Sequence, residues 1–510
     1  MSSLLTNTSA MVALQTMKSI NMNMGKTQSE ISTGKSISNA KDNAAVWAIS
    51  KVMESDVKGF KGISDSLALG SSTISVARQA SESVTDLLTE IKGKIVASQQ
   101  QNVDRSKIQT DITVLRDQIA TVVGAAQFNG LNMISGTDDV EVLASLDRSA
   151  NGNVAASNIK VARQDLTTVA GTYGAGASLA ANAVVQNGAT AVSSAGKTAD
   201  VTFASTWAAS DTANLTIAGV SVSHTATSAS VTDIATAFAG KINALGLAGV
   251  TATNSAGVLT ITSTRAFEEL SVAQSSVSTG GTSAITAVNG AAPTGTNSAA
   301  ASTVRQRAEE IDFSTAANVA EGDSYKATVG NASYNYIAGK NETMQDVARG
   351  LKVAIDSANK PGVSTKVTQD TTTGQWTLNI DNDGAGSASL VLASTGNAGG
   401  KASGGLFGLD AIDVKTTAGA KAALSNIETM IGRSINAAAE FGSAQKRIEI
   451  QSDFVGKLSD ALKAGIGSMV DADMEETSAR LQALQVQQQL ATQSLSIANQ
   501  APQNILALFR

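Results

Sequence analysis

The 510-residue sequence contains no cysteine and a single histidine, His224. The absence of cysteine excludes disulfide bonds and thiolate metal sites. With one histidine, no second imidazole can share a metal ion, and a serine–histidine–acid triad would depend entirely on His224. Because His224 ends the alternating stretch LTIAGVSVSH, we interpret it as an ordinary residue at the end of a strand. We therefore expect no metal site and no cofactor.

Charged residues make up 16% and aromatic residues 3% of the chain, and the net charge is −6. Nucleic-acid binding requires a basic face, which this balance does not supply. No run of about 18 apolar residues is present, so we expect no membrane insertion. No phosphate-binding GxxxxGK[ST] loop occurs, and adjacent carboxylates such as Asp138 and Asp139 point in different directions on most backbones. We expect no catalytic residues and no enzyme.

Only three prolines interrupt the chain, which favours long helices, and apolar residues recur at steps of three and four near both ends. The stripe stops at Gly34, where glycine can end a helix, and resumes from Leu67 with interruptions at Gly70 and Ser81. The N-terminal seam is Ala10, Ala13, Met17, Ile20, Met24, Thr27 and Ile31. The C-terminal seam is Met474, Thr477, Leu481, Leu484, Gln488, Ala491, Leu495 and Ala498. This spacing is typical of helices that pair as a coiled coil.

The last helix is almost free of charge, since Arg510 is the only charged residue from Leu481 onward. A solvated surface helix normally carries Lys and Glu on its outer face. Here the outer face is Gln, Ser, Thr and Asn, which can be buried if they find hydrogen-bond partners. We therefore predict that other protein packs around both terminal helices. The residues expected to carry this packing are Met11, Leu14, Met17, Ile20, Met24, Ile31, Leu481, Leu484, Leu490, Leu495, Ile497 and Leu506.

The middle of the chain, residues 140–420, is rich in Gly, Ala, Ser and Thr and contains short alternating runs. It also contains a duplication: VTF at 201–203 corresponds to IDF at 311–313, and NLTIAGVSVSH corresponds to YKATVGNASYNY. A short amphipathic helix and a hairpin-like pair follow each copy. We interpret these segments as two β-β-α-β-β modules.

The predicted fold is an α+β multidomain protein. Its N- and C-terminal segments form a long helical coiled-coil bundle, and β-rich outer domains are inserted in the middle of the chain. The predicted parts are an inner terminal helical domain (1–40 with 466–510), a helical bundle domain (41–140 with 420–465), an irregular or β connecting part (141–199), a β-α-β module (200–275), a Gly/Ser/Thr-rich linker (276–309), a second module (310–395) and a return linker (396–419).

Three segments resemble the bacterial flagellin family. The stretch Asn39-Ala40-Lys41-Asp42-Asn43 is similar to the N-terminal signature of the family, and Gln127-Phe128-Asn129-Gly130 is similar to the motif that ends its N-terminal helical arm. Ala498-Asn499-Gln500, within LQVQQQLATQSLSIANQAPQNILALFR, is similar to its terminal helix. The matches lie within residues 1–135 and 420–510, whereas the middle has none.

The resemblance implies a structural subunit that is exported and polymerises into the bacterial flagellar filament used for swimming. The implied partners are other copies of the chain, sister flagellins, the flagellar export apparatus, an export chaperone and the filament cap. The implied location is extracellular, in the filament. The N-terminal stretch MSSLLTNTSAMVALQ lacks the basic region, long apolar core and cleavage site of a secretory signal, which agrees with export by that apparatus.

Three alternatives stay open on the sequence alone. A hook–filament junction protein shares the flagellin-like helical ends. A surface adhesin would place its function in the β modules. An enzyme within the insert would need a pocket with clustered polar side chains.

Overall fold

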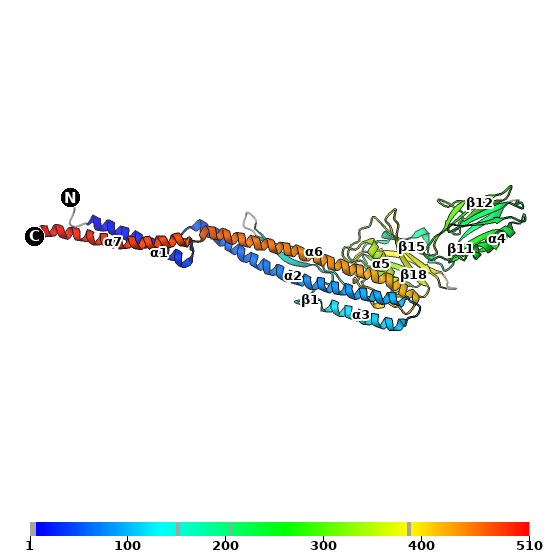
Figure 1. The fold of residues 1–510 in the computed structure, drawn as a ribbon, viewed down its shortest axis with the longest axis horizontal. Coiled ribbons are helices and arrows are strands. Elements are labelled where there is room, and N and C mark those ends of the chain that lie inside the picture. Colours follow the sequence, from blue (N-terminus) through cyan, green and yellow to red (C-terminus); the bar gives the residue numbers. More distant parts are fainter. Residues whose placement is uncertain (1–6, 149–153, 205, 385–388, 509–510) are drawn as a thin grey trace. The chain divides into compact units, whose positions relative to one another are not determined.

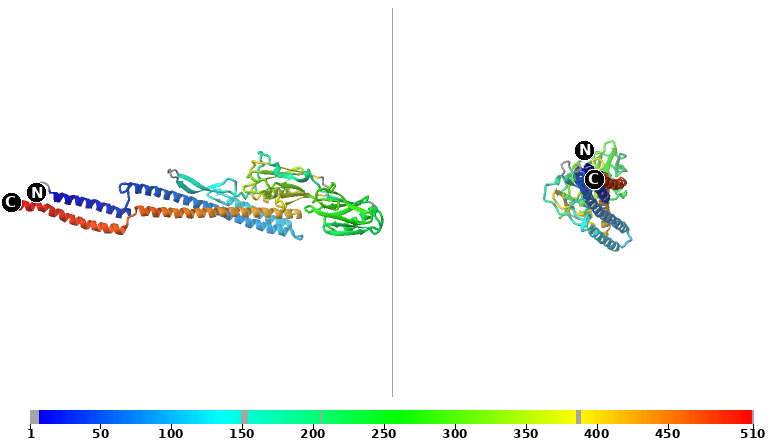
Figure 2. Two further views of the ribbon diagram at one scale, coloured as in Figure 1. Left: turned by 90° about the horizontal axis from the view of Figure 1, so that it is seen from above. Right: turned by 90° about the vertical axis from the view of Figure 1, so that its left-hand side faces the viewer.

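The computed structural model describes residues 7–148, 154–204, 206–384 and 389–508 of the chain. Helices occupy both ends of the sequence and strands occupy the middle (Figures 1 and 2). This confirms the predicted α+β class, in which helical terminal segments flank a β-rich insert. The helices are α1 (Thr8–Thr33), α2 (Ala44–Ser98), α3 (Arg105–Ala125), α4 (Val231–Ala244), α5 (Met344–Ser357), α6 (Thr417–Val470) and α7 (Met474–Leu508).

The chain forms two compact units. The first unit comprises Met1–Ser72, Glu141–Val161 and Ala444–Arg510. The second comprises Thr73–Val140 and Ala162–Ser443. The long helices α2 and α6 contribute residues to both units.

In the first unit, the loop between α1 and α2 lies against the break between α6 and α7. Gly34 follows α1 with φ 68°, a left-handed conformation that favours glycine and ends the helix where the sequence predicts. Lys35 and Asp471 form an antiparallel bridge, and the Ser36 amide donates to the Val470 carbonyl at 2.7 Å. The two breaks are therefore bonded to each other through their backbones.

A hairpin of β3 (Val140–Arg148) and β4 (Val154–Val161) packs on α2 in this unit. Gly70 makes room for it, because a Cβ built on Gly70 would lie 2.7 Å from Cγ1 of Val142. The side-chain amide of Gln451, on α6, donates at 2.9 Å to a carbonyl of β3. Gly70 interrupts the apolar stripe of α2 because a strand occupies that place.

In the second unit, α2 and α6 run antiparallel and α3 returns along the end of α2. The hydroxyl of Thr85 donates to that of Ser434 at 2.9 Å, and Lys94 pairs with Asp111 at 2.6 Å. Ser81, the other interruption of the stripe, is fully buried, and its carbonyl accepts the Ser434 hydroxyl at 3.0 Å. A small polar residue at this position lets the two helices approach and bond.

The β-rich middle consists of two modules with two four-stranded sheets each. Module 1, residues 197–304, has the strand orders β10-β11-β7-β13 and β14-β12-β8-β9. Its core includes Phe203 and Phe238, whose rings stack with centroids 5.5 Å apart. Its strands are β7 (Lys197–Ala204), β8 (Thr212–Ile217), β9 (Val220–Thr225), β10 (Val250–Ser255), β11 (Val258–Ser263), β12 (Leu270–Val277), β13 (Thr282–Val288) and β14 (Ala301–Val304).

Module 2, residues 183–192 and 309–397, has the strand orders β18-β19-β15-β5 and β17-β16-β20-β6. Its core includes the fully buried Phe313, Tyr325 and Tyr336. Its strands are β5 (Ala183–Val185), β6 (Ala191–Val192), β15 (Glu309–Phe313), β16 (Ser324–Val329), β17 (Ala332–Ile337), β18 (Val363–Gln369), β19 (Trp376–Asn382) and β20 (Leu390–Asn397). The structure thus contains the duplication found in the sequence, with α4 and α5 at equivalent places.

The predicted linker at 276–309 is wrong, because this segment completes module 1. Strand β13 pairs with β7, and β14 pairs with β12. The Gly, Ser and Thr of this segment suggest a linker, yet Ile285, Val288 and Val304 are buried in the module core. The predicted connecting part at 141–199 likewise contains β3, β4 and two strands of module 2.

Candidate functional site

Helices α1 and α7 pack against each other along an apolar seam in the first unit. Ile20, Leu484 and Ala491 are buried at its centre, and Met17 and Met24 pack partly buried against them. The sequence pattern predicts this seam, because its residues recur at the three- and four-residue spacing of paired helices. Burial of these side chains holds the two ends of the chain together.

Some polar residues of the pair are bonded between the helices, and others are buried. The side-chain amide of Asn7 donates to the carbonyl of Ala498 at 2.8 Å, and that of Gln488 donates to Oδ1 of Asn21 at 2.8 Å. Thr27 of α1 is buried, with 3% of its surface exposed. The pair therefore satisfies several polar groups without charge, as the absence of charged residues from Leu481 to the end of α7 predicts.

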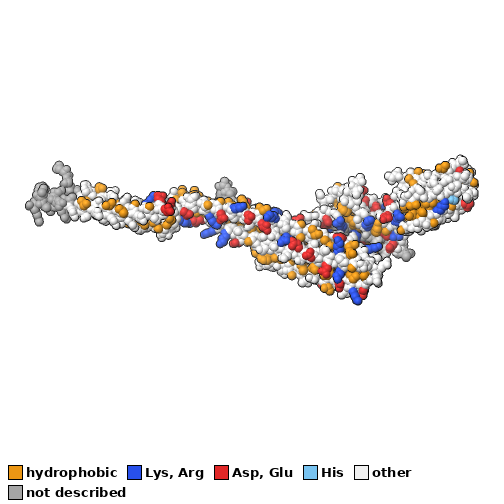
Figure 3. All heavy atoms as spheres, viewed as in Figure 1, with side chains coloured by type: hydrophobic (Ala, Val, Ile, Leu, Met, Phe, Trp, Pro, Cys, Tyr) orange, Lys and Arg blue, Asp and Glu red, His pale blue; other side chains and the backbone are white. Residues whose placement is uncertain are grey.

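The same two helices also carry large apolar side chains that are exposed to solvent. We name these residues the outer apolar face: Met11, Val12, Leu14, Met22, Val486, Leu490 and Ile497. Ile497, at 69%, is among the most exposed of them. In Figure 3, orange side chains extend along this pair with few blue or red ones. Contiguous exposed apolar residues mark an interaction surface more strongly than scattered ones.

A groove of about 740 Å³ runs between the two helices. It is lined by Val12 and Ile20 from α1 and by Leu490 and Ile497 from α7, among others. Its lining is mostly apolar, so the arrangement can bind an apolar side of another helix. No charged side chain lines it.

The structure divides the predicted packing residues between the seam and the outer side. Those on or beside the seam are Met17, Ile20, Met24, Ile31, Leu481, Leu484 and Leu495. Met11, Leu14, Leu490 and Ile497 are exposed. The side chain of Leu506 lies outside the described residues. Val12, Met22 and Val486 escape a search for one heptad stripe, because they lie off the seam.

The first signature segment forms a turn that leads into α2. The carboxylate of Asp42 accepts the backbone amides of Ser38 at 3.0 Å and Asn39 at 3.1 Å. These amides are the main reason that the pKa of Asp42 lies below its usual value of 3.8. Oδ1 of Asn43 accepts the Val46 amide at the start of α2. Asn39, Ala40, Lys41, Asp42 and Asn43 are all exposed.

The second signature segment forms a tight hairpin of β1 (Gln127–Phe128) and β2 (Leu131–Asn132). Asn129 and Gly130 form its turn with φ of 51° and 79°. Two consecutive positive φ angles define the type I′ turn, for which Asn-Gly is the preferred pair. In the third signature segment, Ala498 bonds to α1 as described, while Asn499 and Gln500 are exposed.

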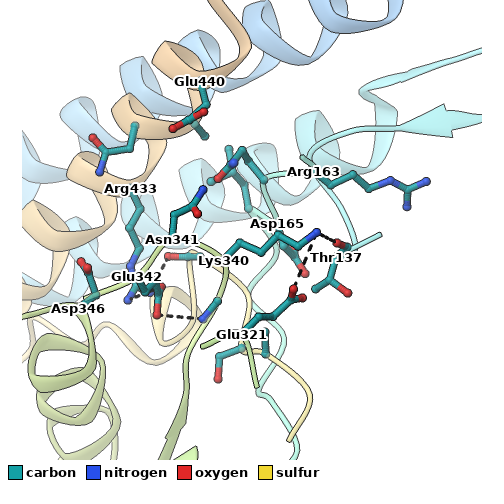
Figure 4. Close-up of a pocket in the computed structure, with 18 of the residues that line it drawn as sticks. Thr137, Arg163, Asp165, Glu321, Lys340, Asn341, Glu342, Asp346, Arg433 and Glu440 are labelled. Atoms are coloured by element: carbon teal, nitrogen blue, oxygen red, sulfur yellow. Dashed lines mark hydrogen bonds and ion pairs between the residues drawn. The ribbon is translucent and has the colours of Figure 1, made fainter. Parts of the chain in front are cut away.

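A polar cavity of about 370 Å³ lies in the second unit between module 2 and α6 (Figure 4). Arg433, on α6, donates to the hydroxyl of Tyr336 and pairs with Glu342 at 3.1 Å. Lys340 pairs with Asp139 and bonds to the Thr137 carbonyl. These side chains join module 2 to neighbouring segments, which indicates a structural role. We name Arg433, Tyr336, Glu342, Lys340 and Asp139 the clamp.

Burial and charge act together on this clamp. Burial alone lowers the pKa of Arg433, but the Glu342 carboxylate and the Tyr336 phenol raise it above its usual value. Burial raises the pKa of Tyr336 well above 10.0, and the nearby Glu342 adds to the shift. Arg433 is thus held charged and Tyr336 neutral, which is the state that the bonds require.

Among the described residues, no three His, Asp or Glu side chains gather as a metal site would require. Within the same ranges, no helix has both the length and the apolarity needed to span a bilayer.

Both ends of the chain match known family models. The bacterial flagellin N-terminal helical region matches residues 4–139, and the C-terminal helical region matches residues 424–509. Over 515 aligned residues the chain is 32% identical to Flagellin A of Rhizobium meliloti, and the alignment covers 100% of both proteins. It is 38% identical to a flagellin of Brucella melitensis over 167 residues, which is 32% of this chain and 59% of that protein.

Among solved structures, FlgL of Xanthomonas campestris is similar with a TM-score of 0.28 and 11% identity. The match covers 81% of this chain and 98% of that chain.

Proposed function

Because this chain belongs to the bacterial flagellin family and is a structural subunit of the flagellar filament, we propose that the α1–α7 pair is its assembly surface. The observation that carries this proposal is the outer apolar face, which includes Leu490 and Ile497 on a helix almost free of charge. Such side chains gain free energy when a neighbouring subunit removes them from water.

Assembly through this surface accounts for both sides of the helix pair. The seam joins α1 to α7 within one subunit, and the outer apolar face is left for other copies. Full burial of one Leu or Ile contributes about 1.5–3 kcal/mol, so a few such residues stabilise a subunit in the filament. A contact between different patches that does not close into a ring generates a helical filament.

We propose the predicted domains as the layers of the subunit. Residues 1–40 with 466–510 form the innermost layer, and 41–140 with 420–465 form the next. The backbone bridge between Lys35 and Asp471 joins the two segments of the innermost layer. The β modules then belong to the outer insert.

The proposed partners follow from membership of the family. They are other copies of the chain, the flagellar export apparatus, an export chaperone and the filament cap. Sister flagellins are further candidates, because Rhizobium meliloti (strain 1021) has flagellins A, B, C and D that align with this chain from end to end. The filament is the extracellular part of the flagellum, so the subunit works outside the cell.

The filament role is favoured over a hook–filament junction role by the 32% identity with flagellins along the whole chain. The flagellin family is structural, which supports a role without catalysis. The polar cavity at Arg433 gives no support to the enzyme alternative, since Arg433 and Lys340 in its lining pair with Glu342 and Asp139.

Removal of Leu481–Arg510 tests the proposal. We expect a truncated chain that stays in solution and forms no filaments, because α1 loses its seam and the outer apolar face loses its C-terminal half. Electron microscopy of purified protein measures the outcome. Long filaments from the truncated chain would show that subunits are joined elsewhere.

A further inference from the structure

The two modules correspond strand for strand. In one sheet, β10-β11-β7-β13 of module 1 matches β18-β19-β15-β5 of module 2. In the other, β14-β12-β8-β9 matches β6-β20-β16-β17. We name β13–β14 and β5–β6 the closing pairs, and the other six strands with their helix the cores. Each closing pair adds one edge strand to each sheet of its module.

The closing pairs also occupy equivalent registers on the first sheet. Phe203 of β7 lies opposite Ser283 of β13, and Phe313 of β15 lies opposite Ala183 of β5. Both phenylalanines are buried in their module cores. On the first sheet, the two closing pairs therefore bind equivalent edges of equivalent strands.

Local sequence supports the same equivalence. Asn187-Gly188 follows β5 with φ of 55° and 62°, and Asn289-Gly290 follows β13 with φ of 53° and 82°. Each closing pair then ends on a valine, Val192 or Val304, which is fully buried. The two segments thus share a strand, an Asn-Gly pair with positive φ and a terminal buried valine.

The order along the chain differs from the pairing in space. The sequence runs closing pair β5–β6, core of module 1, closing pair β13–β14, core of module 2. Yet β5–β6 closes the core of module 2, and β13–β14 closes the core of module 1. We infer that the modules are two copies of one closing-pair-plus-core unit whose closing pairs have changed places, so that each core binds the closing pair of the other copy.

The connections between strands do not force this exchange. Residues 193–196 join β6 to β7, and residues 305–308 join β14 to β15. Lys197, at the start of β7, pairs with Glu309, at the start of β15, at 2.6 Å. Ile380 lies opposite Glu309, and two residues further along β19 the side-chain amide of Asn382 donates to the Val192 carbonyl at 3.3 Å. The start of β7 therefore lies close to the start of β15. A four-residue connection spans up to roughly 16 Å, which is long enough for either closing pair to join either core.

The exchange couples the two modules. Module 1 is continuous in sequence and is inserted between the closing pair and the core of module 2. Module 2 therefore reaches its complete sheets only when β5–β6 and β15, which module 1 separates in sequence, come together. A simple tandem of two independent modules would have no such dependence.

Engineered cysteine pairs in the full chain distinguish the two pairings. Ala191 of β6 lies opposite Val391 of β20, and Thr303 of β14 lies opposite Ser271 of β12. The exchanged arrangement predicts intrachain disulfides in the double variants Ala191→Cys with Val391→Cys and Thr303→Cys with Ser271→Cys. An unexchanged tandem would instead cross-link position 191 with 271 and position 303 with 391.

Positions 271 and 391 are equivalent in the two modules, because the residues that follow them pair with equivalent strand ends. Val272 lies opposite Ile217, the last residue of β8, and Leu392 lies opposite Val329, the last residue of β16. Positions 271 and 391 each precede these residues by one. The four double variants therefore test the same geometry in both pairings.

The chain has no native cysteine, so oxidation reports only on the engineered pairs. Thr328→Cys with Ser333→Cys serves as the positive control, since these hydroxyls lie 3.1 Å apart across one hairpin. Chains with only Ala191→Cys, mixed with chains with only Val391→Cys, should give no cross-linked dimer on denaturing gels. Disulfides at 191–271 or 303–391 would overturn the inference, and so would disulfides between chains. The absence of any disulfide at 191–391 and 303–271, when the positive control forms its own, would also overturn it. None of these outcomes bears on filament formation.

Discussion

The side-chain amide of Asn7 donates a 2.8 Å hydrogen bond to the backbone carbonyl of Ala498. Oδ1 of Asn7 also accepts the Ala10 amide at 3.0 Å and caps the first turn of α1. One uncharged side chain thus caps one terminal helix and bonds the other. This links the beginning and the end of the sequence at the helix pair that we propose as the assembly surface.

Gly70→Ala should destabilise the subunit. Alanine normally stabilises a helix interior by about 0.5–1 kcal/mol relative to glycine. Here the added Cβ would lie 2.7 Å from Val142, and overpacking of that kind costs about 1–3 kcal/mol. Urea unfolding of the monomer measures the difference. Gly62→Ala, which has nothing within 4 Å of the new Cβ, is the matched control and should stabilise the chain.

Arg433→Met should lower the free energy of unfolding by about 1–3 kcal/mol, because it leaves the partly buried Glu342 carboxylate without its cation. Lys463→Met breaks only an exposed pair with Asp460 and should change stability by less than about 1 kcal/mol. Thermal unfolding of the two variants compares them. Equal, small effects would show that the clamp between α6 and module 2 contributes little.

The helical ends follow from the sequence because their signal is strong and local. Apolar spacing, the glycine at position 34 and the scarcity of charge each reflect one property of a packed helix. The reason for the two interruptions of the α2 stripe is visible only in the structure. Gly70 contacts a strand more than 70 residues away along the chain, and Ser81 bonds to α6. Long-range contacts of this kind leave no periodic signal.

The middle was harder to predict for a different physical reason. Three of the four strands of the closing pairs have four residues or fewer, and the segment 276–309 is rich in Gly, Ser and Thr, so its composition suggests a linker. Strand β5 has only three residues, yet it completes a sheet. The heptad pattern predicts only part of the outer apolar face, because it selects seam residues such as Ile20, whereas Val12 and Met22 lie off that stripe.

Deletion of residues 197–304 should leave filament formation intact. Module 1 is continuous and inserted, and the bond between Lys197 and Glu309 shows that the two ends of the cut lie close together. A deletion of 200–395 should instead destabilise the subunit, because it removes Tyr336 and Glu342 from Arg433. Electron microscopy shows whether each deletion variant forms filaments, and thermal unfolding compares their stabilities. Loss of filaments on the smaller deletion would make module 1 part of the assembly contacts.

The turn before α2 should weaken in acid. The pKa of Asp42 is lowered by the amides of Asn39 and Ser38, so its contribution to stability is present above about pH 3.8. It is lost as the pH falls through the lower pKa of the folded state. Carboxyl NMR titration, assigned with Asp42→Asn, measures this value. A pKa of 3.8 or higher would contradict the bonding described here.

The most direct test of the assembly surface is electron microscopy of Ile497→Glu beside Val277→Glu. Both residues are highly exposed, at 69% and 72%, but only Ile497 belongs to the outer apolar face. A buried carboxylate between subunits would be costly, so we expect Ile497→Glu to form no filaments while its modules unfold at the wild-type temperature. Val277→Glu should assemble normally. Normal filaments from Ile497→Glu would contradict the assignment of α1 and α7 as the assembly surface.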